Sequence, residues 1–203
     1  MLELWLIRHG ETDFNAQGRI LGRADMPLSA AGATQARRLG RRIAQLALPF
    51  DGVYASDLTR ARVTAETAFP MERVRLDERL RELDYGVFEG ESWDRLGDEL
   101  AVLARRWRED PYGRRIPRGE SYDDVIERFE AFRAELPHDG RVAAVSHGGT
   151  IRCALYGAMG RPPRGTWQLE LDNTSITRLR YDGRGRAVTL VGLNDRAHLD
   201  LRR

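Results

Sequence analysis

Two histidines occupy matching positions in the sequence, each directly after a short apolar segment and directly before a glycine. His9 stands in the run RHG and His147 in the run SHGG. Imidazole is a nucleophile and a proton carrier, and a neighbouring glycine lets the backbone approach a ligand closely. If both segments are parallel strands of one sheet, both imidazoles lie beyond the carboxyl ends of strands, where open sheets bind ligands. A helix beginning near Gly149 would present free N–H groups there, so the pair indicates an anion site, whereas one such histidine alone is typical of a structural residue.

The composition excludes several other kinds of chemistry. All 33 basic residues are arginine, which excludes a phosphate-binding loop of the GK[ST] type and a Schiff-base lysine. Cys153 is the only cysteine, and the four histidines show no paired metal-ligand spacing. We therefore expect neither a metal site nor a cofactor.

The charge pattern and the hydropathy limit the possible partners. The net charge is only +2, and we find neither a dense basic patch nor a nucleic-acid-reading motif, so we expect no nucleic-acid partner. No segment reaches the roughly 18 consecutive apolar residues of a membrane helix. The N-terminal segment lacks the basic start and the cleavage site of a signal peptide. We therefore expect a cytoplasmic protein without a membrane partner.

The elements that must position the two histidines alternate between strands and helices. Short apolar runs predict strands, and apolar residues at three- and four-residue spacing predict amphipathic helices. The predicted strands are Leu2–Ile7, Val53–Ala55, Val74–Leu76, Arg141–Ser146, Ile176–Tyr181 and Ala187–Val191, the last two joined by a hairpin turn at 182–185. The predicted helices are 30–47, Thr59–Phe69, 92–110, a segment that begins after Ser121, and Gly149–Met159. This alternation predicts an α/β fold, a three-layer sandwich in which helices cover both faces of a mostly parallel central sheet.

Residues 91–120 interrupt this alternation. The predicted helix 92–110 is followed by a loop rich in turn-forming residues, which contains Arg114, Arg115 and Arg118. We interpret 91–120 as a small, cap-like helical excursion over the active site, within a single domain that spans residues 1–203.

Short motifs along almost the whole chain resemble those of one family. RHGET at 8–12, with Asn15 after it, resembles the signature of the histidine phosphatase superfamily, the phosphoglycerate mutase-like proteins. Further blocks follow in the family's order: GRADMPLS at 22–29, SDLTRA at 56–61, LRELDYG at 80–86, SHGG at 146–149, NTSI at 173–176, and Asn194-Asp195 with His198-Leu199. The last two resemble the closing blocks of the family's phosphatase branch.

The resemblance implies catalytic roles for five residues. His9 is the implied nucleophile, which takes a phosphoryl group through one ring nitrogen while a neighbour, usually a backbone carbonyl, holds the other. Arg8, Arg60 and His147 would supply the positive charge that the phosphoryl oxygens need. Glu82 would protonate the leaving alcohol and then deprotonate the water that hydrolyses phosphohistidine. Outside their motifs, Glu82 would be interpreted as a surface salt-bridge residue and Arg60 as an ordinary helix residue.

The resemblance also implies a substrate-binding set. Its members are Asn15, Leu21, Gly22, Tyr85 and Gly148, of which the Asn15 side chain and the Gly148 N–H would donate to phosphate oxygens. The implied substrate is a small phosphomonoester, such as a sugar phosphate, a phosphoglycerate derivative or a nucleotide-loop precursor phosphate. The resemblance is also compatible with a homodimer.

Three readings of the function stay open. A metal-independent phosphomonoesterase is favoured, because mutases of the family carry a longer insertion after the acidic motif, with a proline-rich stretch that 91–120 lacks. A phosphoglycerate mutase is the alternative, since Arg114, Arg115 and Arg118 could bind a substrate carboxylate. A non-catalytic module that binds a phosphorylated ligand is a third reading, and the presence of every residue that the mechanism needs speaks against it.

Overall fold

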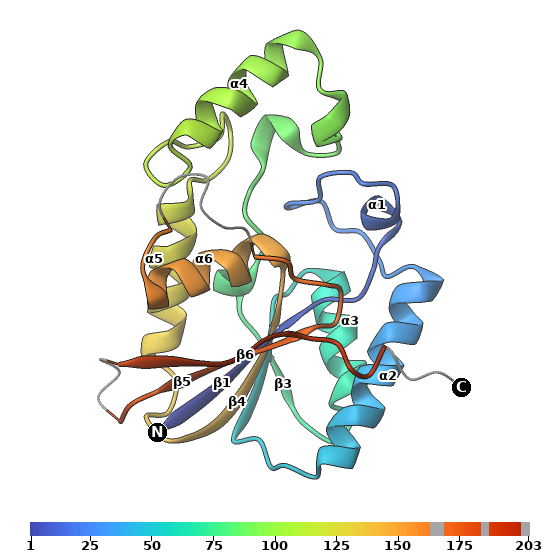
Figure 1. The fold of residues 1–203 in the computed structure, drawn as a ribbon. Helices are drawn as coiled ribbons and strands as arrows, with labels where there is room; N and C mark the ends of the chain where they lie inside the picture. Colours follow the sequence, from blue (N-terminus) through green and yellow to red (C-terminus); the bar gives the residue numbers. More distant parts are fainter. Residues whose placement is uncertain (163–168, 184–186, 200–203) are drawn as a thin grey trace.

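A computed structural model of the 203-residue chain describes residues 1–162, 169–183 and 187–199. Its centre is a six-stranded sheet in the order β3-β2-β4-β1-β5-β6 (Figure 1). The strands are β1 (Leu2–Arg8), β2 (Gly52–Ala55), β3 (Val74–Leu76), β4 (Gly140–Ser146), β5 (Ile176–Tyr181) and β6 (Val188–Asp195). The first four strands pair in parallel, whereas β5 and β6 are antiparallel additions at one edge. The predicted α/β fold with a mostly parallel sheet is confirmed.

The register of β1 and β4 places the two histidines side by side. Both strands are nearly continuous apolar runs, as expected for strands that are covered on both faces. Ile7 lies opposite Val145 and Arg8 opposite Ser146, and the His9 N–H donates to the Ser146 carbonyl at 2.9 Å. The next residue after each of these strands is therefore a histidine at the same edge of the sheet.

Helices cover both faces of the sheet, as predicted. Alternate residues of β1 divide the core, because successive side chains of a strand point to opposite faces. Trp5 and Ile7 pack with α2 (Ala30–Leu46) and α3 (Thr59–Ala68). On the other face, Leu4 and Leu6 pack with α5 (Tyr122–Ala134) and α6 (Gly148–Met159). Figure 1 shows these two helical layers on opposite sides of the strands.

The prediction of one helix over 92–110 is wrong. A short 3-10 helix, η3 (Trp93–Arg95), is followed by a break, and α4 (Asp98–Glu109) begins only after Gly97. Leu96 and Gly97 are extended, so the chain reverses there and the Trp93 ring stacks on that of Trp107, with centroids 5.9 Å apart and planes within 4°. A continuous helix would separate residues 14 positions apart by about 21 Å, so the aromatic contact requires the break. Figure 1 shows α4 as the element farthest from the sheet.

Several boundaries differ in smaller ways. Helix α1 (Asp13–Ala16), which was not predicted, is held by a capping box between Thr12 and Asn15. Strand β6 runs four residues beyond the predicted end at Val191. The predicted turn at 182–185 falls partly outside the described residues. Two 3-10 helices, η1 (Glu78–Leu80) and η2 (Gly86–Phe88), flank the LRELDYG motif.

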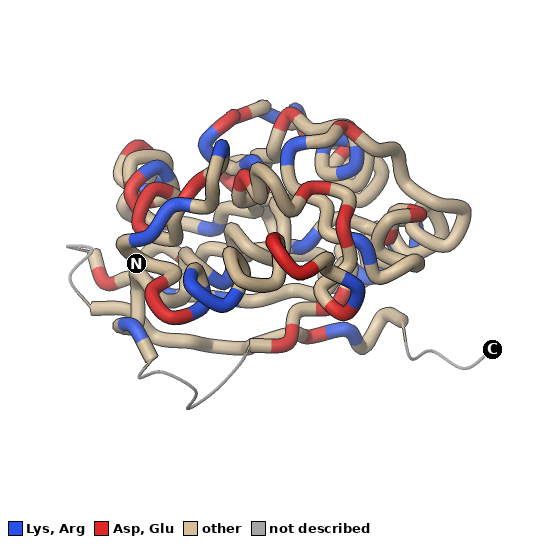
Figure 2. Tube along the Cα trace, turned by 90° about the horizontal axis from the view of Figure 1, so that it is seen from above, with Lys and Arg blue, Asp and Glu red and all other residues tan. Residues whose placement is uncertain are grey.

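Charges and apolar surface are distributed without long runs of one kind. Figure 2 shows basic and acidic positions interspersed along the trace. None of the helices in the described ranges is long and apolar enough to cross a membrane. Cys153 is fully buried in the cluster formed by the excursion with α5 and α6, and is therefore a small core residue.

Candidate active site

His9 and His147 meet at the carboxyl ends of β1 and β4. Their ring centroids are 5.0 Å apart, and the two residues are only 3% and 0% exposed. Burial, together with the nearby Arg60 and Arg8 guanidiniums, lowers the pKa of His9 well below its ordinary value. Burial, Arg60 and His9 lower the pKa of His147 in the same way. Both imidazoles are therefore neutral near pH 7 in the unliganded protein.

Hydrogen bonds fix the tautomer of His9. Its Nδ1 lies 2.6 Å from the Gly10 carbonyl oxygen, which can only accept, so Nδ1 carries the proton and Nε2 carries the lone pair. The sequence predicted a backbone carbonyl as the partner of His9, and this carbonyl belongs to the next residue, Gly10. The Gly10 N–H donates to Thr64 Oγ1 at 3.0 Å, and the His9 carbonyl accepts from Asn173 Nδ2 at 3.0 Å. The closing block at 173–176 therefore holds the nucleophile's backbone.

Four buried nitrogen atoms around His9 have no hydrogen-bond partner in the part of the chain that the structure describes. Arg8 donates through Nη1 to the Leu171 carbonyl at 2.6 Å, and Arg60 donates to the Gly22 and Ala24 carbonyls at 2.7 and 2.8 Å. The Nε atoms of both arginines and both ring nitrogens of His147 are buried without a hydrogen-bond partner within the described ranges. Burial lowers the pKa of Arg60 to about 10, so the guanidinium remains charged at neutral pH. Because buried polar atoms normally have partners, this cluster is suited to an anion.

Glu82 is held at the beginning of α6. The residue is 5% exposed, and its carboxylate accepts backbone N–H groups from Leu83 at 2.8 Å and from Gly149 and Thr150 at 3.0 Å each. A Cβ atom on Gly149 would lie 2.5 Å from Glu82 Oε1. Gly149 is therefore needed for the close approach of the carboxylate to the helix.

These side chains border a small polar cavity of about 190 Å³. Seven of the ten predicted site residues line it: Arg8, His9, Asn15, Leu21, Glu82, Tyr85 and Gly148. Arg60 and His147 lie behind this wall. Gly22 is also outside the lining, because its N–H donates to Glu89 and its carbonyl accepts from Arg60. Gly22 therefore adjoins the site through Arg60.

The polar groups predicted to contact phosphate are available. Asn15 Oδ1 accepts the Thr12 N–H at 3.2 Å, which orients the amide so that Nδ2 is the donor left for a ligand. Gly148 is the first residue of α6, and its N–H has no hydrogen-bond partner within the described ranges. Burial raises the pKa of Tyr85, so its phenol stays protonated.

Six residues of the cavity wall were not among the predicted site residues: Arg19, Ile20, Trp93, Gly149, Arg152 and Leu171. Arg19 lies at the exposed rim, with its guanidinium carbon 3.9 Å from the centroid of the Phe14 ring. Arg152 stands one helical turn after Gly148, a spacing that places both on one face of α6. That spacing was the available signal for Arg152, whereas the position of Trp93 depends on the unpredicted break in the excursion.

Sequence reasoning also missed the role of Glu89. Its carboxylate accepts the N–H groups of Gly22, Arg23 and Ala24 at 2.7, 2.9 and 3.2 Å. These contacts orient the 22–24 loop so that the Gly22 and Ala24 carbonyls accept hydrogen bonds from the Arg60 guanidinium. Glu89 is therefore a positioning residue for Arg60.

The arginines of the 110–120 loop lie elsewhere. Arg114, Arg115 and Arg118 are exposed, none of them lines the cavity, and Arg115 forms an ion pair with Asp124. His198 is buried, with Nε2 3.0 Å from Thr174 Oγ1, and so contacts the segment that holds His9.

A family model identifies the chain. The model of the histidine phosphatase superfamily (branch 1) matches residues 4–195. The chain belongs to this superfamily. A relative named "Probable phosphoglycerate mutase GpmB" from Klebsiella pneumoniae is 39% identical over 210 residues, which cover 98% of this chain and 96% of the relative.

Solved structures of other superfamily members are similar over nearly the whole chain. Phosphoserine phosphatase from Entamoeba histolytica, in complex with 3-phosphoglyceric acid, has a TM-score of 0.84 at 28% identity and covers 98% of this chain and 100% of its own. The α-ribazole phosphatase from Shigella flexneri has a TM-score of 0.80 at 31% identity, covering 96% of each chain. The protein is thus a superfamily enzyme of the phosphatase or mutase type. The described residues contain no group of three or more metal-ligating side chains.

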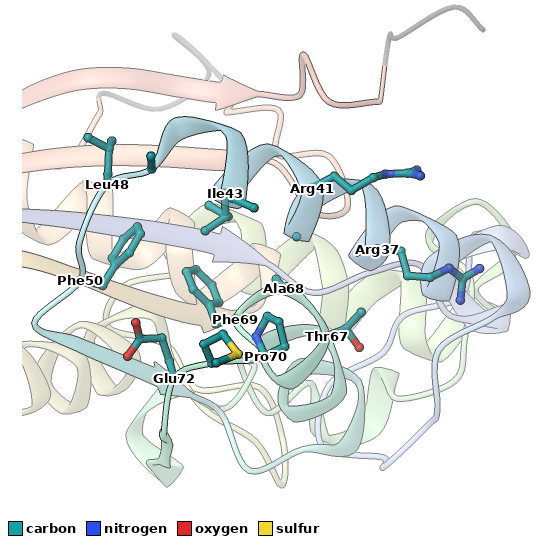
Figure 3. Close-up of a pocket in the computed structure, with 14 residues that line it drawn as sticks. Arg37, Arg41, Ile43, Leu48, Phe50, Thr67, Ala68, Phe69, Pro70 and Glu72 are labelled. Carbon is teal, nitrogen blue, oxygen red and sulfur yellow. The ribbon is translucent and has the colours of Figure 1, made fainter.

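A larger hollow lies between α2 and α3, away from the histidines. It has a volume of about 570 Å³ and a mainly apolar lining that includes Ile43, Phe50 and Phe69 (Figure 3). Arg37 and Arg41 stand at one end and Glu72 at the other. We call this hollow the α2–α3 groove.

Proposed function

We propose that the protein is a phosphomonoesterase that hydrolyses a small phosphorylated metabolite through a phosphohistidine intermediate on His9. The observation that carries this proposal is the fixed tautomer of His9. Its Nδ1 is held by the Gly10 carbonyl, which leaves the Nε2 lone pair beside a cluster of buried, unpartnered donors. The lone pair can attack an electrophile, and the donors around it can bind anionic oxygens. A phosphoryl group provides both the electrophilic atom and the anionic oxygens.

In the first step, His9 Nε2 attacks phosphorus. The Nε2–P bond forms as the bond between phosphorus and the ester oxygen breaks, and Glu82 gives its proton to the departing alkoxide. For this step Glu82 must carry the proton that it donates. Arg8, Arg60 and the Gly148 N–H stabilise the charge on the equatorial oxygens.

In the second step, water attacks the phosphohistidine. Glu82 takes a proton from the water, the Nε2–P bond breaks, and inorganic phosphate leaves with His9 neutral again. His147 is neutral in the empty site, and a bound phosphate dianion raises its affinity for a proton. His147 therefore becomes a third cation only when substrate is present.

Phosphate release in excess chelator tests this proposal. Wild type, His9→Ala and the matched control His138→Ala are compared on p-nitrophenyl phosphate, 3-phosphoglycerate, phosphoserine and α-ribazole phosphate; His138 is an exposed loop histidine. We expect chelator-resistant activity in wild type and His138→Ala, and a loss of about 10⁴-fold or more in His9→Ala. Equal activity in His9→Ala and wild type would exclude His9 as the nucleophile.

A phosphoglycerate mutase is the second candidate, supported by the 39% identity to a relative of that name. A mutase must keep phosphohistidine from water and hold a bisphosphate. With 3-phosphoglycerate and a trace of the bisphosphate, isomer formation faster than phosphate release would establish the mutase. We expect the reverse, since the cavity of about 190 Å³ is small for a bisphosphate and borders solvent through the exposed Arg19. The cytoplasmic location, the homodimer and the absence of a metal requirement stay predictions.

A further inference from the structure

The cavity wall holds more positive charge than one phosphoryl group neutralises. Arg8 and Arg60, at the bottom of the site, match the two charges of a phosphomonoester dianion. Arg152 and Arg19 line the same cavity and are additional. Glu82 is the only acidic residue among the lining residues, and its carboxylate already accepts N–H groups from Leu83, Gly149 and Thr150. Two cations of the wall therefore lack a counter-charge among the described residues that line it.

Arg152 is the better placed of the two. It is half-buried, and its Nη2 donates to the Leu169 carbonyl at 3.1 Å, which fixes the guanidinium without neutralising it. No carboxylate in the described part of the chain forms an ion pair with it. By contrast, Arg128 in the same part of the fold is paired with Glu120 at 3.0 Å. A half-buried guanidinium without a carboxylate partner is a site for an anion from outside.

Because Arg152 follows Gly148 by four residues on α6, the two positions are about 6 Å apart along the helix axis. The Gly148 N–H serves the phosphoryl group, so a guanidinium one turn away faces the part of the substrate next to it. We propose that Arg152 determines specificity by binding a second anionic group, a carboxylate, on a phosphomonoester with a short carbon chain. This inference rests on the proposed hydrolase function. Arg19, at the rim, adds long-range attraction for the same group.

The size of the cavity limits the substrate. Its volume of about 190 Å³ lies below the roughly 300–1,000 Å³ that is usual for ligand pockets. That space holds a phosphoryl group and a few further heavy atoms, so a carboxylate fits where a second phosphoryl group is crowded. Arg114, Arg115 and Arg118, which sequence reasoning considered for a carboxylate, are outside the cavity.

A matched pair of substrates isolates the contribution of the carboxylate. 3-Phosphoglycerate and glycerol 3-phosphate differ only in a carboxylate where the second has a CH₂OH group. The quantity to measure is the ratio of their kcat/KM values in wild type, Arg152→Gln, Arg152→Lys and the control Arg114→Gln. Arg114 is exposed and outside the cavity, so its replacement controls for the general loss of one positive charge.

We expect wild type to prefer 3-phosphoglycerate, and Arg152→Gln to reduce that preference by about 10-fold or more, the value of one hydrogen-bonded charge. Arg152→Lys keeps the charge without the planar fork and should fall between them, and Arg114→Gln should keep the wild-type ratio. An unchanged ratio in Arg152→Gln, or an equal loss on both substrates, would overturn the inference. No turnover of either substrate by wild type would instead contradict the proposed function.

A binding measurement that needs no turnover still tests the inference if Arg152→Gln is too slow for kinetics. In the His9→Ala background, calorimetry gives the Kd of each compound with and without Arg152→Gln. Selective weakening of 3-phosphoglycerate binding supports the inference even where kcat is low. Equal weakening of both compounds means that Arg152 only supports the structure of the wall, and rejects it.

Discussion

Two hollows of the molecule, the α2–α3 groove and the cavity at His9, differ in size and in the polarity of their linings. The α2–α3 groove is three times larger and mainly apolar, about 570 Å³ against about 190 Å³, with its charges only at the ends (Figure 3). The cavity at His9 is small and polar, and buried nitrogens around it have no partner in the described part of the chain. Apolar volume alone would direct attention to the groove. The buried, unpartnered nitrogens gathered around His9 identify the catalytic site instead, because buried polar atoms normally have partners and a bound anion would supply them here.

Adding a methyl group to a glycine in each hollow should give the largest difference in kcat between two matched variants. In Gly149→Ala the new Cβ meets Glu82 Oε1 at 2.5 Å, and because that atom ends a flexible side chain, the fold is kept while the carboxylate moves. We expect kcat to fall by about 100-fold, as for a reacting group displaced by 1 Å. The matched variant Gly40→Ala places a Cβ 3.0 Å from the Thr67 carbonyl oxygen in the groove. Its kcat should stay within about twofold, while the free energy of unfolding changes by about 1 kcal/mol. Steady-state kinetics and urea unfolding measure both, and loss of activity in Gly40→Ala would break the contrast.

Removing a charge near each hollow gives the next largest effect. Glu89→Gln weakens the contacts that hold the 22–24 loop around Arg60, and we expect kcat/KM to fall about 10-fold. Because Arg60 helps to lower the pKa of His9, a displaced Arg60 should also move the acidic limb of the pH–kcat/KM profile toward higher pH. Glu72→Gln, at the end of the groove, is the control. A uniform loss of activity with an unmoved profile would mean that Glu89 has only a general structural role.

Between pH 7 and pH 5, the two histidines of the polar cavity should make the free energy of unfolding depend on pH. The unfolded chain binds protons at His9 and His147 near pH 6.5, whereas the folded chain, with both pKa values lowered, does not. Because the unfolded state then binds more protons, the free energy of unfolding falls as the pH drops below about 6.5, by at most about 1.4 kcal/mol per pH unit for each histidine. Urea unfolding between pH 7 and pH 5 in phosphate-free buffer measures the slope. His9→Gln should reduce it and His138→Gln should not; an unchanged slope in His9→Gln would contradict this origin.

A charge on the rim of the groove should have the smallest effect. Met71 is 93% exposed, so Met71→Lys buries no charge. We expect kcat to change by less than about twofold. The free energy of unfolding should change by less than about 0.5 kcal/mol, as for other surface substitutions. A larger change in kcat at unchanged stability would show that the groove is coupled to the catalytic cavity.

The sequence motifs predicted the catalytic residues better than they predicted the other residues that line the cavity. Arg8 and His9 were located by a strand end together with their motif, whereas Glu82 was located by its motif alone. The helix 92–110 was wrong because apolar spacing does not reveal that Gly97 lets the chain turn back and stack Trp93 on Trp107. Arg152 and Glu89 were missed for a related reason. The role of Glu89 depends on which backbone groups of residues 22–24 face it, which is not local in the sequence, whereas Arg152 had only its four-residue spacing from Gly148 as a signal.

The burial of the single cysteine has a practical consequence. Cys153 is 0% exposed, and burial raises the pKa of its thiol, so little of it is in the reactive thiolate form at neutral pH. A fluorophore with a thiol-reactive group will therefore not label the native protein. A cysteine introduced at exposed Arg114 would be the only labelled position, so a fluorophore can be attached at one chosen place without first replacing the native cysteine.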